Sequence, residues 1–215
     1  MLRLNEKTKT LLLDMDGTLL DLSFDTYFWL DWVPAKLAEK RGMSTAEVMP
    51  DFRAALKAQE GHLNWYCLDY WSSELKMDLA DLKHQIRDRI GYLAGAQEFL
   101  QAARKAGLQL VMLTNAHPQA VTIKNQRTGV CALMDQVISS HELGFPKESA
   151  EFWQRLVDKH RVDLSQSVMI DDSKTVLARA RQFVDVIGIN CPDTSGTVYD
   201  HQEVPSVDGV RLIAV

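Results

Sequence analysis

The chain has 215 residues, of which 46% are hydrophobic and 25% are charged, and these values are typical of a globular protein. Its net charge of −5 argues against nucleic acid or an anionic membrane as a partner, because both attract basic surfaces. The three cysteines form no Cys-x-x-Cys pair, and no apolar run has the length of a signal core or a membrane span. We therefore expect a cytoplasmic protein with reduced thiols.

The first predicted strand is the apolar run Leu11–Leu13, which ends at Asp14 and has the character of a buried parallel strand. The next stretch, residues 21–93, has no strand pattern but four helical patterns, at residues 26–40, 44–59, 65–76 and 79–89. We expect residues 21–93 to be a helical cap inserted after the first strand. Residues 1–20 and 94–215 would then form the catalytic core, and the cap would exclude water from it.

Strands and helices alternate along the rest of the chain. Further strands are predicted at residues 108–113, 136–139, 167–170 and 184–189. Helices are predicted at residues 97–105, 118–127, 148–160 and 176–183, and the tail at residues 193–206 is expected to be irregular. This alternation predicts an α/β fold, a doubly wound parallel sheet with a Rossmann-like core. In such sheets, ligands bind beyond the carboxyl ends of the strands.

Acidic residues follow two of these predicted strands. Asp14 and Asp16 are two residues apart, so they begin on one face of the strand, and Gly17 permits a tight turn after them. Two carboxylates about 4 Å apart repel by about 4 kcal/mol at an effective dielectric near 20, which a divalent cation would offset. Asp171 and Asp172 add two more carboxylates; alone they would be typical of a helix N-cap. Together the four predict an oxygen-ligand site, which suits Mg²⁺ better than zinc.

Donor groups for a phosphate follow the other strand ends. Thr114 and Asn115 close the second strand, and Pro118 suits the first turn of a helix, whose N–H groups can bind phosphate oxygens. Lys147 opens a later helix, from which its ammonium group could reach the same pocket. On its own, a Thr-Asn pair is more typical of a helix cap, and a single lysine before a helix does not indicate a binding site. The prediction therefore depends on the order of these residues along the chain.

That order resembles the four motifs of the haloacid dehalogenase-like hydrolases, over nearly the whole chain. The resemblance implies that Asp14 is the nucleophile and forms an aspartyl-phosphate, while Asp16 donates a proton to the leaving group and then takes one from water. It also implies that Mg²⁺ is held by the Asp14 carboxylate, the Asp16 carbonyl and Asp172, with Asp171 acting directly or through water. Thr114, Asn115 and Lys147 would bind the phosphate. An aspartate at position 16 is typical of the family's phosphatases and phosphomutases.

Four further segments, residues 24–29, 63–71, 113–118 and 144–147, resemble the GMP/IMP nucleotidase branch of that family. This implies a purine 5′-nucleoside monophosphate, GMP or IMP, as the small-molecule substrate. The aromatic residues available to stack on a base are Phe24, Tyr27, Trp29, Trp65 and Tyr66, although such residues most often pack within their own domain. His117 is expected either to touch the substrate or to face solvent.

Other functions share part of this pattern. A sugar-phosphate phosphatase or a phosphomutase would carry every one of the core residues. A phospho-accepting signalling domain also gathers aspartates, a threonine and a lysine around magnesium, but its aspartate pair comes first in the chain and it has no cap. An inactive scaffold would have lost motif residues that are all present here. The sequence leaves the oligomeric state open between a monomer and a weak homodimer.

Overall fold

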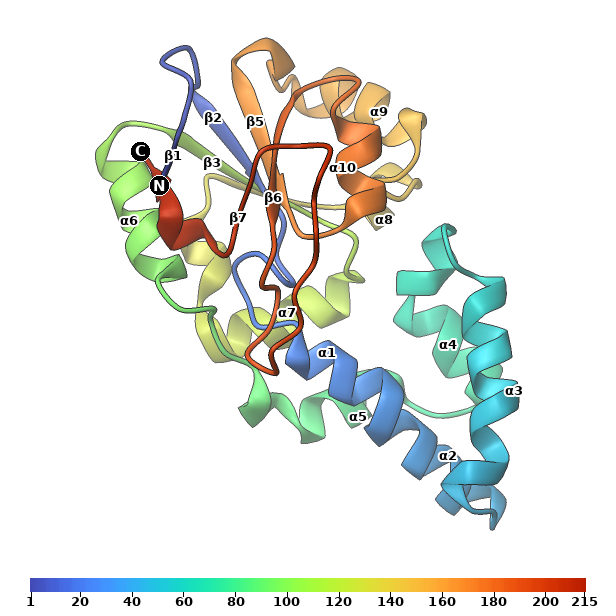
Figure 1. Ribbon diagram of the computed structural model, residues 1–215. Helices are drawn as coiled ribbons and strands as arrows, with labels where there is room; N and C mark the ends of the chain where they lie inside the picture. The colour runs from blue at the N-terminus through green and yellow to red at the C-terminus, as the bar shows by residue number, and fades with distance from the viewer.

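The computed structural model describes residues 1–215 and contains a six-stranded parallel sheet with helices on both faces (Figure 1). Its strand order is β4-β3-β2-β5-β6-β7. The strands are β2 (Thr10–Leu13), β3 (Gln109–Thr114), β4 (Gln136–Ser139), β5 (Ser167–Asp171), β6 (Asp185–Ile189) and β7 (Ser206–Val207). The predicted doubly wound α/β fold is confirmed.

The central strand β2 is buried on both faces, and its leucines divide between two apolar layers. Leu11 and Leu13 belong to a cluster with residues of α6 (Ala96–Lys105) and α7 (Pro118–Thr128). Leu12 belongs to a second cluster on the opposite face, with residues of α8 (Ser140–Leu143), α9 (Ala150–His160) and α10 (Lys174–Ala180). Successive strand residues point to opposite faces, so an uninterrupted leucine run fits this central position.

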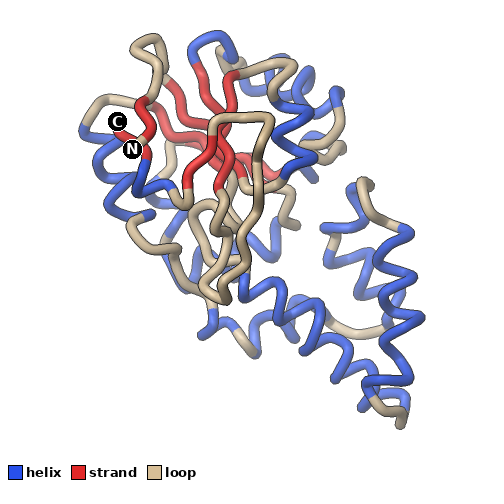
Figure 2. Tube along the Cα trace, in the orientation of Figure 1, coloured by secondary structure: helices blue, strands red, loops and turns tan.

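Residues 21–93, called here the helical segment, contain helices and no named strand, and Figure 2 shows them extending away from the sheet. The helices are α1 (Ser23–Tyr27), the π-helix η1 (Phe28–Trp32), α2 (Val33–Arg41), α3 (Thr45–Ala58), α4 (Leu68–Leu75) and α5 (Leu79–Gln85), with 3₁₀ turns at Leu63–Tyr66 and Arg87–Arg89. They surround an apolar cluster of their own, whose buried members all come from the segment except Ala120 of α7. The segment therefore has a core separate from those of the sheet.

Several short elements differ from the sequence-based expectations. The helix expected over residues 26–40 is a continuous run of α1, η1 and α2, and Pro34 lies at the start of α2 directly after the π-helix η1. The pair β1 (Leu2–Arg3) and β8 (Ile213–Ala214) joins the two ends of the chain, which lie side by side in Figure 1. Strands of two residues are too short to show a hydrophobic pattern in the sequence, so β1 and β8 were not predicted. None of the helices has the length and apolar composition that crossing a bilayer requires.

Candidate active site

The polar residues that follow β2, β3 and β5 meet at one edge of the sheet because these three strands are neighbours. Leu13 pairs with Met112 of β3 and with Ile170 of β5, and the Asp14 N–H donates to the Ile170 carbonyl at 2.9 Å. The chain passes from β2 to β3 and β4 on one side, then crosses to β5 and β6 on the other. This reversal beside β2 is the position at which open α/β sheets bind ligands.

Lys147 lies at the centre of this edge, with its side chain only 2% exposed. Its ammonium group contacts Asp14 Oδ1 at 2.5 Å and Asp171 Oδ2 at 2.7 Å, and it donates to the Leu113 carbonyl at 3.1 Å. Burial would lower the pKa of Lys147, but Asp14 and Asp171 outweigh it and hold that pKa above its ordinary value. The ammonium group is therefore a fixed positive charge between two carboxylates.

Asp14, Asp171 and Asp172 each place a carboxylate oxygen within 4.8 Å of the other two, and all three side chains are buried. Burial raises the pKa of Asp14 to about 7 despite Lys147, and burial together with Asp171 raises that of Asp172 well above its ordinary value. When all three carboxylates are ionised, they and the single Lys147 ammonium group leave two unbalanced negative charges. This charge and the all-oxygen donor set fit a bound Mg²⁺ ion.

Gly17 is what lets the loop after β2 approach Asp172. Its φ is +86°, and a Cβ atom built there would lie 2.5 Å from Asp172 Cγ. A side chain at position 17 would therefore collide with the carboxylate as well as strain the backbone. The glycine that the sequence assigned to a tight turn is also the reason why the acidic residues after β2 and β5 can meet.

The side chain of Asn115 positions Lys147. Its Oδ1 accepts the Lys147 backbone N–H at 2.9 Å, and its Nδ2 donates to Glu148 at 3.0 Å. The Tyr66 hydroxyl, from the helical segment, donates to the same Glu148 carboxylate at 2.6 Å. The Thr114 hydroxyl accepts the Ala116 N–H at 3.0 Å, which leaves its own proton free to donate. Glu148 and Tyr66 were not predicted as a polar pair, because 82 residues separate them.

Asp16 belongs to a second, electrically balanced cluster that sequence analysis did not find. Lys124 of α7 lies 2.6 Å from Asp16 Oδ1 and 2.5 Å from Asp25 Oδ2, and Lys83 of α5 also pairs with Asp25. Both lysine side chains are 2% exposed, and two lysines balance two aspartates. A single lysine in a helical pattern ordinarily predicts an exposed residue, so no local signal marked Lys124 or Lys83.

The pKa values in this cluster follow from burial and from these pairings. Burial raises the pKa of Asp16, and Lys124 only partly opposes it. Burial acts in the same direction on Asp25, but Lys124 and Lys83 outweigh it and hold the pKa of Asp25 below its ordinary range. Asp16 is therefore the carboxyl of the pair that binds a proton more readily, which suits a group that must give and take protons.

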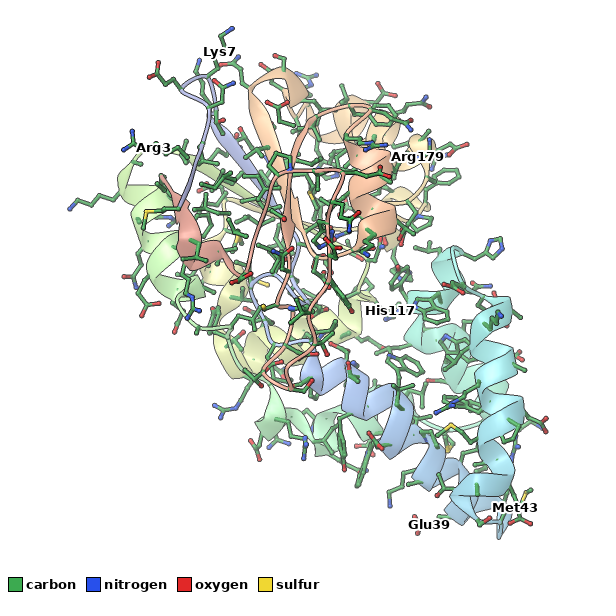
Figure 3. The ribbon with its side chains drawn as sticks, viewed as in Figure 1. Arg3, Lys7, Glu39, Met43, His117 and Arg179 are labelled. Atoms are coloured by element: carbon green, nitrogen blue, oxygen red, sulfur yellow. The ribbon has the colours of Figure 1, made fainter.

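All seven predicted site residues line one cavity of about 260 Å³ between the sheet edge and the helical segment: Asp14, Asp16, Thr114, Asn115, Lys147, Asp171 and Asp172. Of the five candidate aromatic residues, Trp29, Trp65 and Tyr66 line it. Phe24 is buried in the core of the sheet, and Tyr27 lies against the Arg89 guanidinium group at 3.9 Å. His117 also lines the cavity, between the sheet and the helical segment (Figure 3).

A sequence model of the haloacid dehalogenase-like hydrolases matches residues 8–182, a range that includes all seven predicted site residues. The chain belongs to this family. It is 37% identical over 206 residues to the GMP/IMP nucleotidase YrfG of Escherichia coli K12, and the match covers 95% of this chain and 93% of that protein. The same identity and coverage hold for YrfG of Shigella flexneri. The prediction of a hydrolase of this family is confirmed.

Solved structures with low sequence identity share the fold. A phosphatase of the same family from Thermococcus onnurineus superimposes with a TM-score of 0.79 at 19% identity, over 94% of both chains. The hydrolase YfnB from Bacillus subtilis, bound to magnesium, superimposes with a TM-score of 0.67 at 15% identity, over 94% of this chain and 95% of that one. At these identities the likeness supports the architecture alone.

Proposed function

We propose that this hydrolase is a Mg²⁺-dependent phosphatase that transfers the phosphoryl group of a small phosphomonoester to Asp14 and then to water. The observation that carries the proposal is the buried group of Asp14, Asp171 and Asp172 around Lys147, with its two unbalanced negative charges. Bound Mg²⁺ would supply the positive charge that keeps these carboxylates ionised and neutralises phosphate oxygens.

In both steps of the proposed reaction, Asp14 makes and breaks the bond to phosphorus and Asp16 transfers the proton. In the first step, an Asp14 oxygen bonds to phosphorus, the bond to the leaving oxygen breaks, and Asp16 gives that oxygen a proton. In the second step, water attacks the phosphorus, Asp16 takes the proton of that water, and Asp14 leaves as a carboxylate. The raised pKa of Asp16 supports the first role, and its contact with Lys124 supports its return to the ionised form.

The phosphate would be held by the Lys147 ammonium group and the Thr114 hydroxyl, with the Asn115 backbone beside them. Each such donor contributes about 2–4 kcal/mol to a transition state in a dry site. The helical segment would act as the cap, with residues 21–93 closing over a core formed by residues 1–20 and 94–215. Tyr66 supports this role because it contacts Glu148 of the core through its hydroxyl.

For the substrate we propose a purine 5′-nucleoside monophosphate, GMP or IMP first. The relative YrfG is named for these two nucleotides. Trp29, Trp65 and Tyr66 place aromatic rings in the cavity, where a base could stack with about 1–3 kcal/mol per ring contact. A flat aromatic surface favours a nucleotide over a sugar phosphate, which has no ring system of that kind.

Replacing the nucleophile tests the reaction. Asp14→Asn should abolish phosphate release from GMP while circular dichroism remains that of the parent protein. Asp158→Asn, on the exposed face of α9, is the matched control and should retain full activity. Turnover by Asp14→Asn at more than a small fraction of the parent rate would rule out Asp14 as the nucleophile. Steady phosphate release without a second substrate would exclude a phosphomutase.

A substrate panel tests the nucleotide separately. Phosphate release should be Mg²⁺-dependent and fastest with GMP and IMP among nucleoside monophosphates and sugar phosphates. Trp65→Ala should raise KM for GMP by roughly tenfold, the equivalent of about 1.4 kcal/mol, and change KM for a sugar phosphate little. Tyr27→Ala, outside the cavity, is the control. Equal rates across the panel would refute the nucleotide proposal and leave the phosphatase proposal standing.

A further inference from the structure

Cys67, His117 and His141 form a second group of metal-ligating side chains outside the carboxylate site. The Cys67 sulfur and one ring nitrogen of each histidine all lie within 4.8 Å of one another. The three residues come from different parts of the fold: Cys67 precedes α4 in the helical segment, His117 precedes α7, and His141 lies in α8. The cluster therefore spans the junction between the helical segment and the sheet.

One ring nitrogen of this cluster has no hydrogen-bond partner, and the contacts of the other ring are long. His141 Nε2 is buried and has no hydrogen-bond partner, which ordinarily costs about 1–3 kcal/mol. His117 is 9% exposed, and its Nδ1 accepts the Gln119 N–H at a long 3.4 Å. Asp69 of α4 lies 3.4 Å from His117 Nε2, where it could be a fourth ligand or orient a ligating ring. A bound cation would give the orphaned nitrogen a partner.

The donor set of one sulfur and two nitrogens is that of zinc and its neighbours, and not of magnesium. In a tetrahedral zinc site, the bond lengths place ligand atoms about 3.5 Å apart, so distances of up to 4.8 Å in this cluster would need to shorten by about 1.3 Å at most. Burial lowers the pKa of His141 to about 4, and the neighbouring His117 acts in the same direction. Burial also lowers the pKa of His117. Burial thus acts against the charged form of each ring, and a neutral ring has a lone pair to donate.

We propose that Cys67, His117 and His141 bind one Zn²⁺ ion that fastens the helical segment to the sheet. Because His117 is the N-cap of α7 and lies two residues after Asn115, the ion would lie beside the phosphate-binding loop. Contraction around the ion would draw α4 toward α7 and α8, and so restrict the opening of the cavity. The proposal does not depend on the phosphatase reaction, since it concerns different ligands and a different metal.

Cobalt reports directly on a thiolate ligand, because a cysteine–Co²⁺ bond gives a charge-transfer absorption that carboxylates cannot give. Titration of the full-length protein with Co²⁺ in excess Mg²⁺ should produce this band and saturate at about one equivalent per chain. Cys67→Ser should abolish the band. Serine can replace the cysteine in accepting the Tyr70 N–H at the start of α4, so this variant should fold. His141→Gln should weaken Co²⁺ binding by roughly tenfold or more.

Cys131→Ser and Cys191→Ser are the matched controls, because both residues are half-buried free cysteines outside the cluster, and both variants should keep the band. Zn²⁺ in excess Mg²⁺ should raise the Tm of the parent protein and not that of Cys67→Ser. Absence of a thiolate band in the parent protein, or a band that survives in Cys67→Ser, would overturn the proposal. Equal Zn²⁺ stabilisation of both proteins would also overturn it.

Discussion

Replacing Lys124 with methionine would remove the ammonium group that lies between Asp16 and Asp25. The lysine contacts these carboxylates at 2.6 and 2.5 Å, and its side chain is 2% exposed. Methionine has a similar length and no charge. The buried cluster would change from two lysines and two aspartates, with no net charge, to one lysine and two aspartates.

The expected loss of stability is about 3–5 kcal/mol, the usual cost of leaving a buried charge without its partner. Part of this cost disappears if Asp16 takes up a proton, because burial already raises the pKa of Asp16 and Lys124 is the main group that lowers it. The pKa of Asp16 should therefore rise further in Lys124→Met. The stability loss should be smaller at pH 6 than at pH 9, measured by urea unfolding.

The effect on turnover should differ between the two chemical steps. Asp16 becomes ionised when it donates to the leaving group, but in Lys124→Met its higher pKa lets it take up a proton from solvent before water attacks the aspartyl-phosphate. An Asp16 reprotonated in this way cannot accept the proton of the attacking water. Lys124→Met should release one equivalent of nucleoside rapidly and then slow by about 10²–10⁴-fold, with activity recovering as pH rises. Rapid-quench measurements of nucleoside and phosphate separate these steps.

Lys83→Met is the matched control. Lys83 is equally buried and pairs with Asp25, but it does not contact Asp16. This variant should lose a comparable amount of stability with a smaller shift in the pH profile of turnover. In Lys124→Met/Asp25→Asn, the loss of both charges restores neutrality and should recover part of the stability. Equal pH profiles for Lys124→Met and Lys83→Met would refute the assignment of Lys124 as the residue that tunes Asp16.

The carboxylate site and the contact between Tyr66 and Glu148 lead to three other predictions. Gly17→Ala should weaken Mg²⁺ activation by roughly tenfold or more, because the new Cβ would lie 2.5 Å from Asp172 Cγ; an unchanged Mg²⁺ titration would contradict this. In EDTA, the stability of the fold should decrease as pH rises from about 4 to about 7. Burial raises the pKa of Asp14 from 3.8 to about 7, so over this range the folded protein keeps a proton that the unfolded chain releases. The loss of unfolding free energy from Asp14 is on the order of 4 kcal/mol, and bound Mg²⁺ should offset it. Denaturant unfolding with and without Mg²⁺ measures the loss and the offset. Tyr66→Phe should lower kcat/KM by roughly threefold to tenfold, because it removes the 2.6 Å hydrogen bond to Glu148. Tyr27→Phe is the control, and an equal fall in its kcat/KM would argue against that hydrogen bond as the cause.

The strands that carry the site were predictable because their signals are local. Strands were expected at residues 108–113 and 167–170, and the structure has β3 at Gln109–Thr114 and β5 at Ser167–Asp171. The helix expected at residues 118–127 is Pro118–Thr128, which begins at a proline and ends before Gly129, whose φ is +70°. Proline and glycine determine these ends through their own backbone preferences, so neighbouring residues suffice to predict them.

The contacts that tune the site were not predictable in this way. Lys124 reaches Asp25 across 99 residues of sequence, and no pattern near either residue marks the pair. The same holds for Cys67, which has no metal-type spacing in the sequence but lies beside His117 and His141 after folding. Such pairs depend on how the helical segment packs against α7 and α8, and that packing involves apolar contacts spread over many residues.

By itself, the sequence determined the sheet, the order of its main strands along the chain, and which polar residues follow them. It could do so because apolar runs, their periodicity and their polar ends are properties of adjacent residues. Only the tertiary structure shows which carboxylate and ammonium groups neutralise one another. The Asp14, Asp171 and Asp172 group is left two charges short of neutrality, whereas Asp16 and Asp25 are balanced by Lys83 and Lys124. Charge balance depends on distances of a few ångströms between distant segments, and only the folded chain sets those distances.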